Sequence, residues 1–182
     1  MKIISWNIRG CKHPRKIKTM AKKLKDEKSV ILFLQETRCK SETLDKVGQR
    51  ICKGCKIMVV DYIGTTGGME ILWHPDSICL TDWRENHFSL STNFTILDSV
   101  EKRNLTNIYG PIAFSLKPTF LEFLNWIKGQ TRDSSWIMGG DFNLITSLGE
   151  KKGGWRSMDI LQEDFREFVE QIQLVDIETG NE

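Results

Sequence analysis

The chain has 182 residues, of which 40% are hydrophobic and 27% are charged. This length and apolar content favour one globular domain over residues 1–182 and exclude an intrinsically disordered chain. The longest strongly apolar run, Val30–Leu34, is far shorter than the roughly 20 residues of a membrane-spanning helix, so we expect no membrane partner.

The net charge of +2 conceals an asymmetry along the chain. Residues 1–56 hold 16 Lys and Arg against 5 Asp and Glu, whereas residues 57–182 hold 10 against 19. A basic first third can meet the phosphate backbone of a nucleic acid. The same lysines can equally form the solvated face of a helix, so both interpretations stay open.

The cysteines at positions 11, 39, 52, 55 and 79 are an odd number without a secretory context, which predicts reduced thiols. Cys52 and Cys55 have the spacing of a zinc knuckle or a redox pair. A zinc site needs two more ligands nearby, and the candidates His74 and His87 lie far along the chain. We therefore do not expect a metal at this pair.

The first sixty residues alternate between strand and helix patterns. Lys2–Asn7 is typical of a strand, and Pro14 opens a helix at a position where its missing N–H costs nothing. Val30–Leu34 has the continuous apolar character of a strand buried on both faces. Ser41 can cap a second helix, in which Leu44, Val47 and Ile51 keep helical spacing.

The middle of the chain consists of short β-rich segments without helices between them. These segments are Ile57–Ile63, Met69–Trp73, Ile78–Trp83, Phe88–Leu97 and Leu105–Tyr109. Strands joined without helices pair antiparallel, and Gly67-Gly68 is typical of a hairpin turn.

Helical patterns return in the last third. Phe120, Leu124 and Ile127 form one apolar stripe after Pro118, and a second stripe follows later in the chain, made by Leu161, Phe165, Phe168 and Ile172. Between the two lies a short buried strand, Trp136–Gly140, that runs into Asp141. Strands with helices at both ends of the chain suggest sheets sandwiched between helical layers.

Four polar clusters stand where apolar strands end. They are Ser5-Trp6-Asn7, Gln35-Glu36-Thr37, Asn107–Pro111 and Gly140–Asn143. The ends of strands in α/β folds are where functional sites assemble, because a rigid sheet directs their side chains into a common crevice. Each cluster alone is weak support, since a Glu after a strand is more often a surface residue and Gly, Asp and Asn all favour turns.

Taken together, the clusters contain the groups needed to hydrolyse a phosphoester with the help of a metal. Glu36 can ligate a hard cation through oxygen, and Asp141 can position and deprotonate a water. Asn7, Asn143 and Tyr109 can hydrogen-bond the oxygens of a phosphoester as negative charge grows there. The glycine-rich loops of nucleotide motors and dinucleotide enzymes are absent from the sequence.

The order of these motifs resembles the endonuclease/exonuclease/phosphatase superfamily, which includes apurinic endonucleases and pancreatic deoxyribonuclease. More narrowly, the chain resembles the endonuclease domain of plant LINE-type non-LTR retrotransposons. The narrower resemblance rests on Asn7–Gly10, His13–Lys16, Gly67-Gly68 before Leu72-Trp73, and Asp141–Asn143 before Glu150–Gly154.

The resemblance implies a four-layer α/β sandwich, in which two mixed sheets pack face to face and helices lie outside. It also implies that Glu36 ligates Mg²⁺, with Mn²⁺ as an alternative, and that Asn7 lies beside the metal. Tyr109 and Asn143 would contact the scissile phosphate, while Asp141 would orient or activate the attacking water. The residues expected to contact DNA are Arg9, Lys12, Arg15, Lys16 and Trp155, the last of these in a loop beside Gly153-Gly154.

The sequence departs from the family pattern in two places. Arg9 stands where relatives often carry an acid. The family also ends with a strand-borne Asp and a Ser-Asp-His element, and neither follows Leu174–Ile177 here. The expectation is a domain that lacks its last strands and is incomplete at the C-terminus, with little or no activity.

Three functions follow as alternatives. The first is a Mg²⁺-dependent endonuclease that nicks target DNA for retrotransposition, with the reverse transcriptase domain of the same element as its partner and the nucleus, or otherwise the cytoplasm, as its location. The second is a phosphatase on a phosphoinositide or another phosphoester. The third is a non-enzymatic retroelement remnant that binds nucleic acid weakly through Lys12–Lys28. Four tryptophans in apolar contexts are expected in the core, at positions 6, 73, 126 and 136.

Overall fold

The structure, a computed structural model, describes residues 1–61, 67–130, 135–150 and 161–175. The chain divides into two compact units. The first holds Met1–Gly110 and Asp133–Phe142, and the second holds Pro111–Arg132 and Asn143–Glu182. The prediction of one domain over residues 1–182 stays a prediction.

The first unit contains two four-stranded sheets, and the first of these is mixed. Its strands are β1 (Ile3–Asn7), β2 (Ile31–Gln35), β3 (Lys56–Val60) and β4 (Met69–Trp73), in the order β1-β2-β4-β3. β1 and β2 run parallel, and the other neighbours run antiparallel. Every residue of β2 is buried, which confirms the prediction from its continuous apolar run.

The second sheet is also mixed. Its strands are β5 (Ile78–Glu85), β6 (Ser89–Ile96), β7 (Arg103–Tyr109) and β8 (Trp136–Asp141), paired in sequence order. The pairing is antiparallel from β5 to β7 and parallel between β7 and β8. The predicted antiparallel pairing is confirmed within each sheet, but the consecutive strands β4 and β5 belong to different sheets and do not pair.

The two sheets pack face to face through a shared apolar core. Side chains of β2 and β4, among them Phe33 and Ile71, meet Leu90, Phe94 and Leu105 of β6 and β7. β1 contacts β8, and β2 contacts both β7 and β8. This arrangement of two mixed sheets with helices confirms the predicted α/β sandwich.

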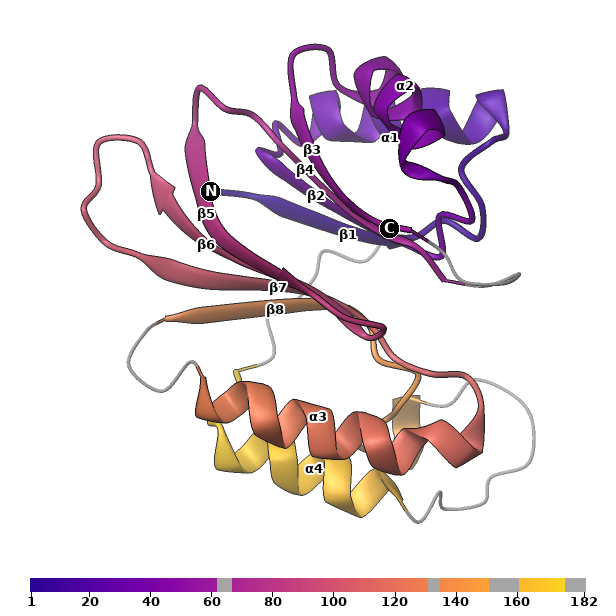
Figure 1. Ribbon diagram of the computed structural model, residues 1–182, viewed down its shortest axis with the longest axis vertical. Helices are drawn as coiled ribbons and strands as arrows, with labels where there is room; N and C mark the ends of the chain where they lie inside the picture. Colours follow the sequence, from indigo (N-terminus) through magenta and orange to yellow (C-terminus); the bar gives the residue numbers. More distant parts are fainter. Residues whose placement is uncertain (62–66, 131–134, 151–160, 176–182) are drawn as a thin grey trace. The chain divides into compact units, whose positions relative to one another are not determined.

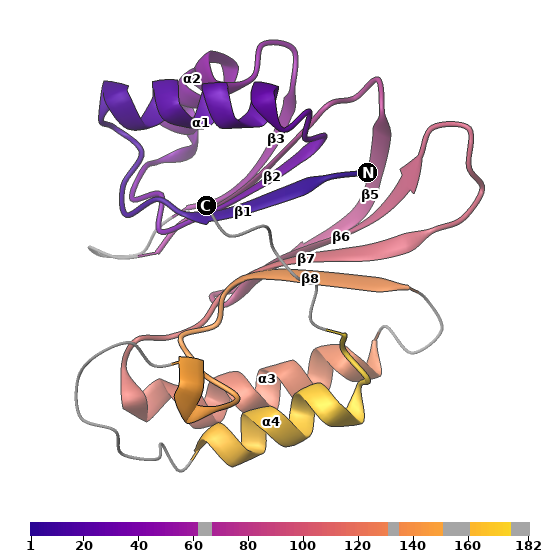
Figure 2. The same ribbon diagram turned by 180° about the vertical axis from the view of Figure 1, so that it is seen from behind.

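Two helices cover the outer face of the first sheet. α1 (Pro14–Asp26) and α2 (Ser41–Ile51) lie side by side against it (Figures 1 and 2). Apolar side chains of α1, such as Met20, pack with Leu32 and Leu72 in a second core. α2 begins at Ser41 itself, and its N-cap is Lys40. The Ser41 N–H donates to Asp61 Oδ1 at 2.7 Å. The predicted Ser41 cap is therefore one residue off.

The connection between β3 and β4 also differs from the prediction. It runs from residue 61 to residue 68, so Gly67 and Gly68 stand at its end and do not form a two-residue turn. Both glycines have positive φ, at 93° and 84°. Such values favour glycine, which explains the pair.

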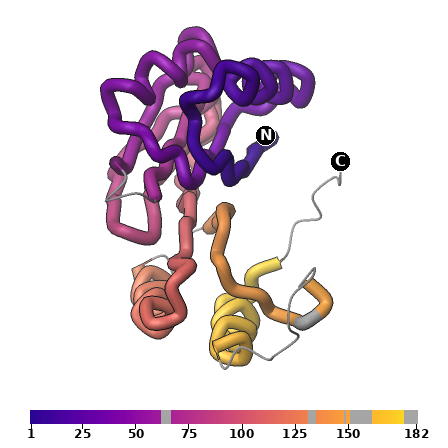
Figure 3. Tube along the Cα trace, turned by 90° about the vertical axis from the view of Figure 1, so that its right-hand side faces the viewer, coloured from indigo at the N-terminus to yellow at the C-terminus, as the bar shows by residue number. Residues whose placement is uncertain are grey.

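The second unit is helical in its described residues. It contains α3 (Lys117–Gly129) and α4 (Leu161–Gln171), preceded by the short 3₁₀ helices η1 (Phe114–Leu116) and η2 (Leu148–Glu150) respectively. α3 and α4 pack side by side and are seen nearly end-on in Figure 3. Trp126 on α3 is 56% exposed. The prediction that Trp126 belongs to the core is therefore wrong. Within the described ranges, no helix combines the length and apolar character needed to cross a membrane.

Candidate active site

The carboxyl ends of four strands meet at one place in the first unit. In the parallel pair β1–β2, Asn7 is the register partner of Gln35, and in the parallel pair β7–β8, Tyr109 is the partner of Asp141. The Asn7 Nδ2 group donates a hydrogen bond to Asp141 Oδ2 at 2.7 Å. The two sheets are thus joined at the strand ends, where α/β folds place their sites.

Asp141 is positioned by the glycine before it. Gly140 has a φ of +144°, and a Cβ at this position would lie 2.0 Å from the carbonyl oxygen of Ile108 on β7. A side chain cannot be accommodated so close to a neighbouring backbone. Glycine therefore allows β8 to approach β7 directly before the Asp141 carboxylate.

Glu36 stands on a tightly held loop after β2. Its backbone is left-handed, with a φ of 55°, and the residue is 5% exposed. The Gly10 N–H donates to the Glu36 carbonyl at 2.7 Å, and the Thr37 N–H donates to the Gly68 carbonyl at 3.2 Å. The loop after β1 and the residue before β4 thus hold the Glu36 loop from both sides.

The phenol of Tyr109 interacts electrostatically with both carboxylates. Burial, together with the negative charges of Glu36 and Asp141, raises the pKa of Tyr109 above its usual value, while Arg38 and Arg9 act in the opposite direction. The phenolic oxygen is buried and makes no hydrogen bond to any residue that the structure describes. The phenol of Tyr109 therefore stays protonated and can donate a hydrogen bond to a ligand.

Arg38 is a site residue that the sequence analysis missed. Its guanidinium donates to Glu36 Oε1 and forms an ion pair with it, while 47% of the Arg38 side chain stays exposed. Arg38 directly follows the cluster Gln35-Glu36-Thr37. This adjacency could have identified it, but only the left-handed turn at Arg38 (φ 51°) brings its side chain back to Glu36.

Asn107 joins the two sheets beneath the site. This fully buried residue of β7 accepts a hydrogen bond from Gln35 Nε2 at 2.6 Å. Its own Nδ2 group donates to the carbonyls of Leu34 and Glu70 at 3.1 and 3.0 Å. The sequence signal for this role is an amide inside an otherwise apolar strand, because a buried polar group needs partners.

The basic residues predicted to contact DNA lie at the start of the chain. Arg9, Lys12 and Arg15 are exposed. The Lys16 ammonium donates to the carbonyls of Ile8 and Arg9 at 2.7 and 3.0 Å, so it also braces the loop after β1. Contact between any of these residues and DNA stays a prediction.

Two predicted site residues are not placed with the others. Asn143 has a left-handed backbone, with a φ of 50°, and it begins the second segment of the second unit. Its contact with the scissile phosphate stays a prediction. Trp155 lies outside the described residues.

The donor set at the strand ends fits a divalent metal with hard character. Glu36 and Asp141 supply carboxylate oxygens near the Tyr109 phenol, which has no hydrogen-bond partner in the described part of the chain, and Asn7 supplies an amide. Mg²⁺ is usually held by one or two carboxylates together with substrate phosphates and water. The residues present therefore suit this ion, which Glu36 would ligate with Asn7 beside it, and this assignment stays a prediction.

Comparison with known structures gives the same fold. The 3′ phosphatase NExo from Neisseria, bound to a product DNA hairpin, superposes with a TM-score of 0.71 at 14% identity, over 93% of this chain and 70% of its own. Mannosyl-6-phosphatase Bt3783 from Bacteroides thetaiotaomicron gives 0.64 at 14% identity, over the same shares of the two chains. Humanized TDP2 from D. rerio gives 0.59 at 16% identity, over 78% of this chain and 66% of its own.

The chain thus spans about two thirds of the length of these solved structures. No curated protein matches it in sequence. The model of the Endonuclease/Exonuclease/phosphatase family matches residues 4–161, which include all four strand-end clusters. Enzymes of this family are hydrolases, among them nucleases and phosphatases, and generally depend on a divalent metal. With its two mixed sheets and the site at their strand ends, the chain belongs to the endonuclease/exonuclease/phosphatase family.

Proposed function

We propose that this chain is a Mg²⁺-dependent phosphodiester hydrolase that nicks DNA, as the endonuclease of a plant LINE-type non-LTR retrotransposon. The observation that carries the proposal is the buried phenol of Tyr109. It has no hydrogen-bond partner among the described residues, and it interacts electrostatically with the carboxylates of Glu36 and Asp141 and with two arginines. Such a site offers oxygen ligands for a cation and donors for a phosphate within one small space.

The metal-binding role falls to Glu36, with Asn7 beside it. When Mg²⁺ is bound, it neutralises charge on the phosphate and lowers the pKa of a water. Glu36 is suited to hold the ion because burial and the two flanking loops fix its backbone. Arg38 already balances the charge of this carboxylate and can turn toward the phosphate when the ion takes its place.

Asp141 is the residue proposed to orient and deprotonate the attacking water. The hydrogen bond from Asn7 holds one carboxylate oxygen and so fixes the rotation of the group. A general base needs this kind of fixed position within hydrogen-bonding distance of the proton that it removes.

Tyr109 is proposed to donate its hydrogen bond to a non-bridging oxygen of the scissile phosphate. Its raised pKa keeps the phenol protonated at physiological pH. A donor that is already oriented stabilises the charge that develops in the transition state. Asn143 is proposed as a second contact of the same phosphate.

DNA is the proposed substrate because the first third of the chain is strongly basic, with exposed Arg9, Lys12 and Arg15 near the strand ends of the first sheet. Neisseria NExo, which has the same fold, is a 3′ phosphatase bound to a DNA product. In the full-length element the reverse transcriptase domain would be the partner, and the nucleus the place of action.

The test is nicking of supercoiled plasmid in Mg²⁺ by the wild-type chain and by Glu36→Gln. We expect Glu36→Gln to lose at least about 100-fold in rate, on the scale measured for removing one stabilising group from an active site. The matched control is Glu85→Gln, which changes an exposed glutamate at the end of β5 and should leave the rate unchanged.

Nicking that survives Glu36→Gln would overturn the proposal. No nicking by the folded wild-type chain would overturn it as well, and would instead agree with the expectation of little or no activity. Soluble phosphoesters and phosphoinositides are assayed beside the plasmid. The phosphatase alternative is indicated instead if the wild-type chain turns over these compounds, leaves the plasmid intact and loses this turnover in Glu36→Gln. Salt-sensitive DNA binding without turnover of any substrate would indicate a binding remnant.

A further inference from the structure

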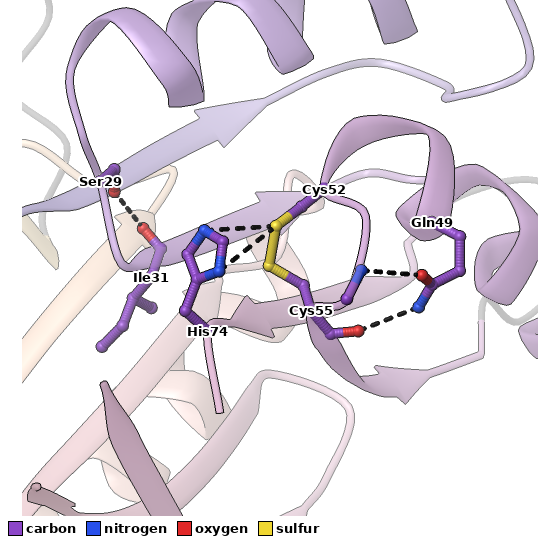
Figure 4. The surroundings of a disulfide bond; sticks show 7 residues. Ser29, Ile31, Gln49, Cys52, Cys55 and His74 are labelled. Carbon is purple, nitrogen blue, oxygen red and sulfur yellow. Dashed lines mark hydrogen bonds between the residues drawn. A yellow bond between two sulfur atoms is a disulfide. The ribbon is translucent and has the colours of Figure 1, made fainter. Parts of the chain in front are cut away.

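Cys52, Cys55 and His74 form a cluster outside the candidate active site. The cysteines are joined by a disulfide, which corrects the prediction of reduced thiols at these positions (Figure 4). Each of the three side chains offers one ligand atom, and these atoms all lie within 4.8 Å of one another, close enough to hold a metal ion.

The sheet register explains how a distant histidine reaches the cysteines. β3 and β4 pair antiparallel, with Lys56 opposite Trp73. Cys55 directly precedes β3 and His74 directly follows β4, so the two residues stand at the same end of the hairpin. Cys52 caps the C-terminus of α2 three residues earlier. The separation of His74 along the chain therefore does not separate it in space.

The loop between the cysteines is held in shape independently of the disulfide. The side chain of Gln49 on α2 donates to the Cys55 carbonyl at 2.9 Å and accepts from the Gly54 N–H at 3.2 Å (Figure 4). Gly54 takes the left-handed conformation, with a φ of 84°, that such a turn requires. Reduction of the sulfurs would leave these contacts in place, so the loop is preorganised for a ligand.

The distances suit a tetrahedral zinc ion. His74 Nε2 lies 3.4 Å from Cys52 Sγ. In a tetrahedral site, Zn–S and Zn–N bonds of about 2.3 and 2.05 Å separate the sulfur from the nitrogen by about 3.6 Å. The two sulfurs must move apart, which rotation of the cysteine side chains allows once their bond is broken.

The position of Cys52 favours a cation over a reactive thiol. Catalytic thiols of redox pairs gain from the positive end of a helix dipole, but Cys52 is at the C-terminal, negative end of α2. The negative end of a helix stabilises a nearby cation. Both sulfurs belong to buried residues, while His74 is partly exposed and leaves a path for an ion.

We propose that Cys52, Cys55 and His74 bind one zinc ion when the two thiols are reduced, and that the disulfide is the oxidised, metal-free form of this site. A phosphine reductant with water converts the disulfide into two thiols and is itself oxidised to the phosphine oxide. Zinc binding then releases the two thiol protons. The three side chains fill three tetrahedral positions, and a water fills the fourth.

The test is a titration of the chain with Co²⁺, followed by Zn²⁺, before and after reduction with a phosphine. The reduced chain should bind one Co²⁺, with a thiolate-to-cobalt charge-transfer band and visible bands of tetrahedral cobalt, and Zn²⁺ should displace it. The oxidised wild-type chain should bind at least 10-fold more weakly, and this comparison needs no variant.

Variants locate the site. Cys52→Ser should reduce the thiolate band by at least half and weaken binding at least 10-fold, and His74→Gln should weaken binding while the band remains. Cys79→Ser changes an exposed free cysteine and should change nothing. The proposal is overturned if the reduced, folded chain binds no cobalt, if oxidation leaves binding unchanged, or if Cys79→Ser has the same effect as Cys52→Ser.

Discussion

At the scale of single residues, Tyr109 links the electrostatics of the strand ends to the proposed chemistry. Its phenol is buried at 8% residue exposure, and no described residue accepts its proton. Burial, and then the nearby carboxylates of Glu36 and Asp141, holds the pKa of Tyr109 above its usual value, so the proton stays on the phenol. The group is thus available to a ligand oxygen across the whole neutral range.

We predict that Tyr109→Phe lowers the nicking rate by about 100-fold, because the variant removes one preorganised donor and keeps the ring. The free energy of unfolding should stay the same or rise slightly, since a buried hydroxyl without a partner costs stability. Plasmid nicking and urea unfolding measure the two effects. A rate loss accompanied by an equal loss of stability would instead make Tyr109 a packing residue.

Glu70 is a buried carboxyl that, unlike Tyr109, has no proposed role in the candidate active site. The residue is fully buried on β4, and neither carboxyl oxygen has a hydrogen-bond partner in the described residues. Burial, and then the charge of Asp45, raises the pKa of Glu70 to about 8. The native chain therefore keeps a proton that the unfolded chain releases near pH 4.5.

This difference predicts that stability falls as pH rises from about 4.5 to about 8. In this window the native state binds one more proton than the unfolded state, so the free energy of unfolding decreases, by up to about 5 kcal/mol. Urea unfolding at pH 5 and pH 8.5 measures the change. Glu70→Gln should remove most of it, whereas the exposed control Glu85→Gln should keep it. An unchanged slope in Glu70→Gln would contradict the assignment.

At the scale of elements, the two sheets are joined by side-chain hydrogen bonds as well as by apolar packing. Asn107 on β7 contacts Gln35 and the backbone of β2 and β4, and Asn7 on β1 contacts Asp141 on β8. The first set lies beneath the site and the second lies within it. Together they fix the register of one sheet against the other, which positions Glu36 relative to Tyr109 and Asp141.

We predict that Asn107→Ala destabilises the chain by about 2–4 kcal/mol, because it removes three buried hydrogen bonds, two to backbone carbonyls and one from the Gln35 amide. Nicking should fall together with stability, since the strand ends lose their register. Asn93→Ala is the control, because Asn93 on β6 makes only an exposed side-chain contact with Asp82 among those described. Chemical denaturation compares the two, and equal small losses would contradict the role of Asn107.

The pattern of elements was largely predictable because hydrophobic periodicity is a local property. The strand Met69–Trp73 was predicted residue for residue, and the β2 run differed by one position at each end. The errors concern residues whose surroundings are set by parts of the chain that lie far away in sequence. Asp61 accepts the N–H at the start of α2, and the apolar neighbours of Trp126 do not cover it.

At the scale of the whole molecule, the charge asymmetry of the sequence predicts how DNA binding depends on salt. Each lysine or arginine that contacts a phosphate releases about 0.9 counterions, so the slope of log K against log salt reports the number of contacts. The basic first third makes the start of the chain the expected contact surface.

We predict that Lys12→Ala and Arg15→Ala each make this slope less steep by about 0.9 and weaken binding to all duplex sequences alike. Fluorescence anisotropy with a labelled duplex, on a Glu36→Gln background that prevents cleavage, measures the slope. Lys102→Ala, an exposed lysine in the acidic remainder of the chain, should leave it unchanged. A slope that depends on Lys102 and not on Lys12 would place DNA elsewhere.

The sequence by itself determined the family, the α/β sandwich and the identity of the four strand-end clusters, because motif order and apolar periodicity are written along the chain. Tertiary structure alone decided which distant residues meet. Arg38 returns to Glu36 through a left-handed turn, Asn107 finds partners on two other strands, and antiparallel register brings His74 to Cys52. Sequence spacing does not encode these distances, since strand pairing and sheet packing set them.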